Sequence, residues 1–158
     1  MNIPKHSFIR WIVMYRRILT RDRLAKMGIC QEKECLLCRS EPESINHLFF
    51  ACEFSKECLK GVLEWLKIGI KNTNIDGLWR RITRKAKGMI SRSLIKAIIA
   101  LLIYHIWRAR NGALWNKAVT RPAKILKMIK EESRSRTSGS TQKKHTSKDA
   151  TWIDNLFK

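Results

Sequence analysis

Four potential metal ligands lie close together in this chain and constrain its fold more than any other feature. They are Cys35, Cys38, His47 and Cys52. Two cysteines separated by two residues place both sulfurs on one side of a tight turn, and the later His and Cys can complete a tetrahedron. Three thiolates and one imidazole suit Zn²⁺. Because protein atoms would fill all four positions, the pattern indicates a structural ion without an open position for a catalytic water.

Other uses of the cysteines fit the sequence less well. A thioredoxin-type redox pair requires a βαβ context, and we predict no strands around the first two ligands. A disulfide framework requires an oxidising compartment, whereas the sequence opens with MNIPKHSF and shows no apolar signal segment, so we expect an intracellular protein, nuclear or cytoplasmic. Cys30 lies five residues before Cys35, which breaks the knuckle spacing. Cys58 lies in an apolar helical run and is expected in the core. The spacing leaves open whether either can replace a ligand.

Further residues around the ligands form a wider pattern. They are Pro4-Lys5, the aromatic-containing run Phe8–Ile12, Thr20–Leu24, Gly28-Ile29 and the segment Glu43–Cys52. Together with the ligands, these residues resemble the zinc-binding domain of plant LINE-type (non-LTR) reverse transcriptases over about residues 4–66. Leu19, Ser44 and Asn46 depart from the family pattern. Downstream, Ile106–Asn111 resembles a segment that follows this domain in the same polyproteins. The resemblance implies a Zn²⁺-binding accessory domain without the polymerase or RNase H domains.

The net charge of +20 is concentrated after the metal segment. Residues 65–130 carry 16 basic residues and one acid, net +15, whereas residues 32–64 carry 4 basic and 7 acidic residues, net −3. Phosphate contacts dominate nonspecific affinity for nucleic acids. We therefore expect the later helices, rather than the metal turn, to bind RNA or DNA. The expected contacts are to phosphates and do not depend on base sequence. The predicted contact residues are Arg80, Arg81, Arg84, Lys85, Lys87, Arg108 and Arg110.

Hydrophobic periodicity predicts a mainly α chain. We expect a small zinc-stapled helical module over residues 1–69, packed on or followed by a basic helical segment over residues 75–132. Serine-rich residues 133–150 are predicted to be a disordered low-complexity linker. The apolar tail, residues 151–158, either docks back on the helices or binds a protein partner as a short helix.

Three local features predict where helices begin, end or distort. Thr20 is a plausible N-cap of a short helix that stops at Gly28, and Pro122 begins a later helix. Ser44 can cap the helix that carries His47. On a regular helix the side chains of His47 and Cys52 would point about 140° apart. That helix must therefore end or distort near Ala51 if both side chains are to reach one ion.

The longest predicted helix covers residues 91–116. Its apolar centre, residues 94–107, is shorter than the roughly 20 residues needed to cross a bilayer. We therefore expect a buried central helix and no membrane partner. His105 in this run is expected to be a core histidine.

Carboxylate positions argue against an enzyme. Polymerases and RNase H enzymes hold two metals with clustered carboxylates, and the four aspartates are isolated: Asp22, Asp76, Asp149 and Asp154. We predict no catalytic residues and no small-molecule substrate. The function favoured by the sequence is that of a zinc- and nucleic-acid-binding accessory module of a retrotransposon protein. The alternatives are a structural or protein-interaction helical domain with a purely structural zinc, and a non-catalytic retroelement fragment.

Overall fold

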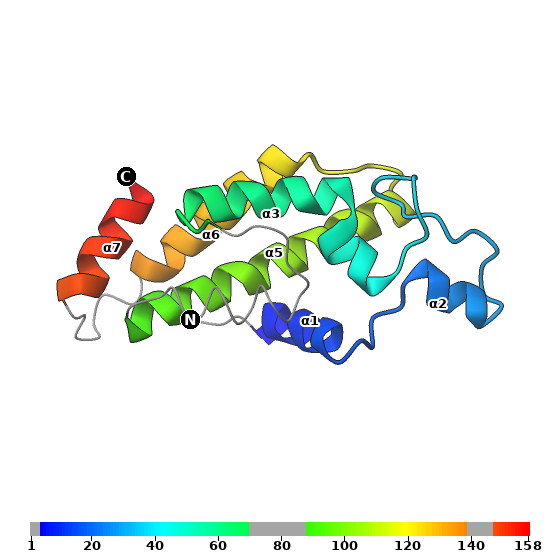
Figure 1. Cartoon of the computed structure of the whole chain (residues 1–158), viewed down its shortest axis with the longest axis horizontal. Coiled ribbons are helices and arrows are strands. Elements are labelled where there is room, and N and C mark those ends of the chain that lie inside the picture. Colours follow the sequence, from blue (N-terminus) through cyan, green and yellow to red (C-terminus); the bar gives the residue numbers. More distant parts are fainter. Residues whose placement is uncertain (1–3, 70–87, 139–146) are drawn as a thin grey trace.

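The computed structural model describes residues 4–69, 88–138 and 147–158 (Figure 1). Within these ranges the chain is predominantly helical and has no β-strand beyond one isolated bridge between Glu34 and Pro42. The elements are α1 (Pro4–Met14), α2 (Arg21–Lys26), a π-helical turn η1 (His47–Ala51), α3 (Glu53–Trp65), α5 (Met89–Trp115), α6 (Pro122–Ser138) and α7 (Ser147–Phe157). The predicted mainly α fold is confirmed.

Helix α5 is the centre of the fold. It runs along most of the molecule, with α3 and α6 on one side and α1 on the other (Figure 1). Its side chains from Leu94 to Ile106 are mostly buried on all sides, as expected for a helix that is apolar around its whole circumference. Each fully buried Leu or Ile contributes roughly 1.5–3 kcal/mol of hydrophobic stabilisation. The Ser91 hydroxyl accepts a hydrogen bond from the Gly88 N–H at 3.1 Å and helps to begin the helix.

The apolar length of α5 also satisfies the criteria for a membrane span. By length and composition alone, Met89–Trp115 is long and apolar enough to cross a bilayer. However, 67% of its most apolar 18-residue window is buried against the rest of the protein. This burial agrees with the expectation of a core helix.

Helix α6 packs against both α3 and α5. It begins at Pro122 as predicted and buries Ile125 and Ile129. Gly61 in α3 allows a close approach, since a Cβ at this position would lie 3.1 Å from the Leu126 side chain. Helix α6 continues to Ser138 and α7 begins at Ser147, so both ends of the segment that we predicted to be disordered, residues 133–150, are helical. Its middle, residues 139–146, lies outside the described part of the chain.

The C-terminal tail lies against α3 and α6. The Trp65 indole N–H donates a hydrogen bond to the Leu156 carbonyl at 2.9 Å, and the Trp65 and Phe157 rings lie 5.7 Å apart. The guanidinium of Arg134 lies 6.0 Å from the Phe157 ring centre. The tail therefore docks back on the helices, which was one of its two predicted roles.

Helices α1, α2 and α3 end in left-handed turns of the same type. Gly28, Arg16 and Lys67 have φ values of 71°, 53° and 54°. At α2, the Ile29 N–H bonds the Leu24 carbonyl and the Gly28 N–H bonds the Ala25 carbonyl. This is the Schellman arrangement, in which glycine is the preferred left-handed residue. The predicted stop at Gly28 is confirmed.

Candidate metal centre

The knuckle that carries Cys35 and Cys38 is a tight hairpin. The Cys35 N–H bonds the Glu41 carbonyl at 2.8 Å, and the Arg39 N–H bonds the Cys35 carbonyl at 2.8 Å. Arg39 takes a left-handed conformation with φ 57°, which turns the chain directly after Cys38. The backbone thus holds the two thiols on the same side of the turn.

The other two ligands lie at the ends of the π-helical turn η1. The Ser44 hydroxyl accepts a hydrogen bond from the His47 N–H at 3.0 Å, in agreement with its predicted capping role. The Cys52 N–H then bonds the His47 carbonyl at 2.7 Å, five residues back instead of four. The Ser55 hydroxyl donates to the Leu48 carbonyl within this turn. The predicted distortion near Ala51 is present, and it allows His47 and Cys52 to face the same point.

The four side chains converge on one small volume. Their ligand atoms all lie within 4.8 Å of one another, with Cys35 Sγ 3.9 Å from Cys52 Sγ and Cys38 Sγ 3.2 Å from His47 Nε2. Bonds of 2.3 Å to sulfur and 2.0–2.1 Å to nitrogen in a tetrahedral zinc site imply separations of about 3.8 Å for two sulfurs and about 3.6 Å for sulfur and nitrogen. The Cys₃His set therefore has the chemistry and spacing of a structural metal site.

Burial and a carboxylate orient these ligands. Cys35, Cys52 and His47 are buried, whereas Cys38 is partly exposed. Glu41 Oε2 lies 3.1 Å from Nδ1 of His47. A proton on Nδ1 shared with this carboxylate leaves the Nε2 lone pair directed at the metal position. Glu41 thus orients the His47 imidazole toward the metal position. The sequence pattern did not identify this residue.

The two buried thiols differ in acidity. A hydrogen bond donated by Cys35 to Cys52, together with burial, raises the pKa of the Cys35 thiol. The same bond lowers the pKa of Cys52. Metal binding to cysteine requires the thiolate forms, so a cation here would release protons.

Comparison with known proteins agrees with this geometry. Residues 1–58 match the family described as zinc-binding in reverse transcriptase. This part of the chain is similar to that family. No curated protein and no solved structure matches the chain. The matched reverse-transcriptase zinc-binding domain contains all four ligands, and the family is a metal-binding accessory domain and not a catalytic one.

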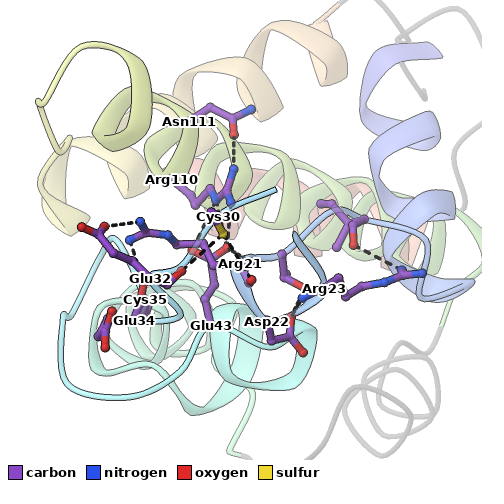
Figure 2. A network of polar contacts seen from close by, with 12 residues as sticks. Arg21, Asp22, Arg23, Cys30, Glu32, Glu34, Cys35, Glu43, Arg110 and Asn111 are labelled. Atoms are coloured by element: carbon purple, nitrogen blue, oxygen red, sulfur yellow. Dashed lines mark hydrogen bonds and ion pairs between the residues drawn. The ribbon is translucent and has the colours of Figure 1, made fainter. Parts of the chain in front are cut away.

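A buried ion pair attaches the zinc-binding domain to α5. Glu43, in the loop before η1, is completely buried and faces Arg110 of α5 (Figure 2). Arg110 donates to Glu43 Oε1 from Nη2 at 2.8 Å and from Nε at 3.1 Å. Arg110 also donates to the Asn111 side chain at 3.2 Å, and the Arg21 backbone N–H donates to Glu43 at 3.1 Å. The segment Ile106–Asn111 thus supplies the partner of a carboxylate in the zinc-binding domain.

A second set of polar contacts holds α2 to the segment that carries the four ligands, residues 30–52, which we call the metal loop. Arg21 pairs with the Glu32 carboxylate and donates to the Glu34 carbonyl at 3.2 Å (Figure 2). Arg23 donates to the Arg16 carbonyl at the end of α1. Arginines near the metal centre therefore act largely within the protein.

The predicted nucleic-acid contacts have different outcomes. The prediction that Arg110 contacts a phosphate is wrong, because its guanidinium is buried and bonded to Glu43. Arg108 is exposed on α5 and stays a prediction. The remaining predicted residues lie outside the described part of the chain: Arg80, Arg81, Arg84, Lys85 and Lys87.

The two other cysteines lie apart from the ligand set. Cys58 is buried in α3, and burial raises the pKa of its thiol to about 12, as expected for an inert core residue. Cys30 is partly exposed, and its Sγ lies 3.4 Å from the Glu32 carbonyl. Neither thiol belongs to the cluster of four ligand atoms found among the described residues.

Proposed function

We propose that this chain is a Zn²⁺-binding accessory module, derived from a retroelement protein, that holds RNA or DNA by phosphate contacts. The observation that carries the proposal is the separation of two features. The buried Cys₃His centre lies in a segment with an excess of acids, while exposed lysines and arginines follow it on α5 and α6. Zinc then orders the metal loop, and the helices supply the positive surface.

Zinc is the proposed metal because of its ligand preference. Thiolate and imidazole ligands in a tetrahedral set favour Zn²⁺ over Mg²⁺ or Ca²⁺, which prefer oxygen ligands. A closed set of four protein ligands supports a structural role. Metal content by mass spectrometry, with and without a chelator, tests the identity and stoichiometry directly.

The positive surface of the described helices is clearest on α6. Its exposed basic residues are Lys124, Lys127, Lys130 and Arg134, and the exposed Arg121 directly precedes it. Lys124 and Arg108 of α5 line the same small surface cavity of about 140 Å³, so the two helices contribute to one basic area. Clustered cations on one surface raise the local concentration of a polyanion.

Salt dependence tests the nucleic-acid part of the proposal. Binding of a fluorescein-labelled oligonucleotide of about 16 nucleotides is measured by anisotropy at several salt concentrations. A protein that makes about six phosphate contacts loses about a thousandfold in affinity between about 50 and 200 mM salt. If neither RNA nor DNA binds at the lower salt concentration, the proposal is wrong and the chain retains only a structural zinc site.

Two sets of variants locate the contacts. Lys124→Gln with Lys127→Gln, and separately Arg80→Ala with Arg81→Ala and Arg84→Ala, should reduce affinity and make the salt slope shallower by about one for each contact removed. Zinc content should stay the same, because none of these residues is one of the four clustered ligands. A set that binds with the wild-type affinity and slope is not part of the phosphate-binding surface.

A further inference from the structure

Helix α1 carries a row of exposed aromatic rings. Phe8, Trp11 and Tyr15 are 57%, 46% and 64% exposed. The Phe8 and Trp11 ring centres are 6.3 Å apart at an interplanar angle of 21°, and those of Trp11 and Tyr15 are 5.0 Å apart at 45°. Large aromatic side chains usually bury most of their surface. A contiguous exposed apolar patch instead indicates a binding surface.

The aromatic row lies on the face of α1 that does not pack on α5. His6, Ile9 and Val13 form the buried face, and the His6 ring lies 4.4 Å from the ring of Tyr104 in α5. Positions 8, 11 and 15 are spaced by three and four residues, so their side chains share one face of a helix. The rings are therefore not required for the helix to pack.

The charge around the row fits a polyanion. Residues 4–31 contain seven basic residues and one acid, Asp22. Helix α1 ends at Met14, one residue before Tyr15, and the left-handed turn at Arg16 leaves Arg16 and Arg17 exposed. Protein–protein interfaces also enrich aromatic residues and arginine, but the large excess of basic residues over residues 4–31 favours an anionic partner. Aromatic rings beside arginines are also the combination found in grooves for single-stranded nucleic acid.

We infer that the exposed face of α1 stacks unpaired bases of single-stranded RNA or DNA, while Arg16 and Arg17 contact the adjacent phosphates. This inference rests on the proposed nucleic-acid function and adds a second, aromatic contribution to it. Bases in a duplex are already stacked on one another, so the face should favour a single strand over a duplex of the same sequence. Stacking accepts any base, which agrees with binding that is not sequence-specific.

Substitutions that separate aromatic from apolar character test the inference. Trp11→Leu keeps an apolar side chain but removes the ring system, and Trp11→Phe keeps a ring. With a labelled single-stranded RNA of about 16 nucleotides, we expect Trp11→Leu to weaken binding about tenfold and Trp11→Phe to bind close to wild type. The salt slope should be unchanged in both, because neither substitution removes a phosphate contact.

A matched control is available on α5. Trp115 is 77% exposed at the C-terminal end of α5. Helix α1 packs beside Tyr104, an earlier residue of the same helix, so Trp115 is not part of the aromatic row. Trp115→Leu should leave single-strand affinity unchanged. Zinc content and helicity, measured for every variant, confirm that the substitutions leave the fold intact.

The outcomes separate the inference from the proposed function. If the wild type binds the RNA and the combined variant Phe8→Leu, Trp11→Leu, Tyr15→Leu binds as tightly, the inference is overturned and the proposed function remains. The same conclusion holds if this variant changes only self-association in sedimentation, since the face then binds a second copy. If the wild type binds no nucleic acid at about 50 mM salt, the proposed function itself fails.

Discussion

Helix α5 contacts two clusters that each contain a carboxylate, one fully buried and one partly exposed. Arg110 meets Glu43 of the metal loop, where both side chains are almost fully buried and Glu43 receives bonds from Arg110 and from the Arg21 backbone. His105 meets Glu132 of α6 at 2.9 Å, and this carboxylate is 35% exposed. His6 of α1 and Arg136 complete the second cluster, with Arg136 Nη2 2.8 Å from His6 Nδ1.

The two clusters differ in how completely their polar atoms are paired. In the second cluster, His6 Nε2, His105 Nδ1 and Arg136 Nη1 are buried without a hydrogen-bond partner among the described residues. Buried polar atoms without partners cost free energy. The Glu43 cluster therefore fixes one arrangement of the metal loop, whereas the His6–His105 cluster is held in place by the apolar packing around it.

Metal removal should give the largest difference between the two regions. Cys38→Ser, or chelation, should abolish metal binding and expose the backbone of residues 30–52, because binding of a structural zinc contributes about 10 kcal/mol or more to folding. Helices α5 and α6 should keep their slow amide exchange, since their core contains no metal ligand. Hydrogen exchange read by mass spectrometry measures both regions at once.

Cys30→Ser is the matched control for the metal experiment. Its thiol is partly exposed and is not one of the four clustered ligands. We expect unchanged metal content and unchanged exchange. Loss of metal in this variant would place Cys30 in the ligand set instead.

Arg110→Met should be the next most disruptive change. The variant leaves the Glu43 carboxylate buried without its charged partner, which costs about 3–5 kcal/mol. Urea unfolding with zinc present measures the loss. Arg108→Met, two residues earlier and exposed, should change stability by less than about 0.5 kcal/mol. Equal effects of the two substitutions would show that the ion pair has no special role.

Acid should weaken the second cluster selectively. Burial, followed by the nearby Arg136, lowers the pKa of His6 from 6.5 to about 4, and burial also lowers the pKa of His105. The unfolded chain therefore binds protons below about pH 6.5 that the folded chain does not, so stability falls between pH 6.5 and 4, on the order of 2 kcal/mol for His6. Above pH 6.5 both states are neutral at these positions and the effect is absent.

A His6 variant isolates this effect from titration elsewhere. His6→Asn should be less stable at pH 7 but should lose less on acidification than the wild type. Urea midpoints at pH 7 and pH 5, measured with excess zinc, give the comparison. An identical pH dependence in both proteins would contradict a role for His6.

The smallest expected effect concerns the ends of α2 and α3. Gly28 takes the left-handed position at the end of α2, whereas Lys67 takes it at the end of α3. Lys67→Gly should stabilise the protein by up to about 1 kcal/mol, because glycine adopts positive φ without a Cβ clash. Gly28→Ala should destabilise it by a similar amount. Thermal unfolding of both variants tests the sign.

Local sequence patterns predicted the features that depend on near neighbours. The four ligands, the cap at Ser44, the stop at Gly28 and the start at Pro122 all follow from residues within a few positions of one another. Thr20 occupies the N-cap position of α2, but its hydroxyl donates to the Asp22 carboxylate and does not cap the backbone. The distortion of η1 was also predictable, since a His and a Cys five residues apart cannot share the face of a regular α-helix. Short-range geometry restricts such positions strongly.

Contacts between distant residues were not predictable in the same way. Glu43 and Arg110 are 67 residues apart, and His6 and Arg136 are 130 apart. Charge counting placed Arg110 among the phosphate contacts, because composition does not distinguish an exposed arginine from a buried one. The family resemblance included both Glu43 and the segment Ile106–Asn111, but it gave no indication that Glu43 and Arg110 form an ion pair.

The Glu43–Arg110 pair has a practical consequence for the choice of a minimal fragment. The family match ends at residue 58, but the cation that neutralises its buried carboxylate lies on a helix beyond residue 88. A protein truncated at the end of the match would keep every thiol and the imidazole, yet would leave an uncompensated charge where α5 had been. The smallest autonomous folding unit is therefore longer than the stretch by which the domain is recognised.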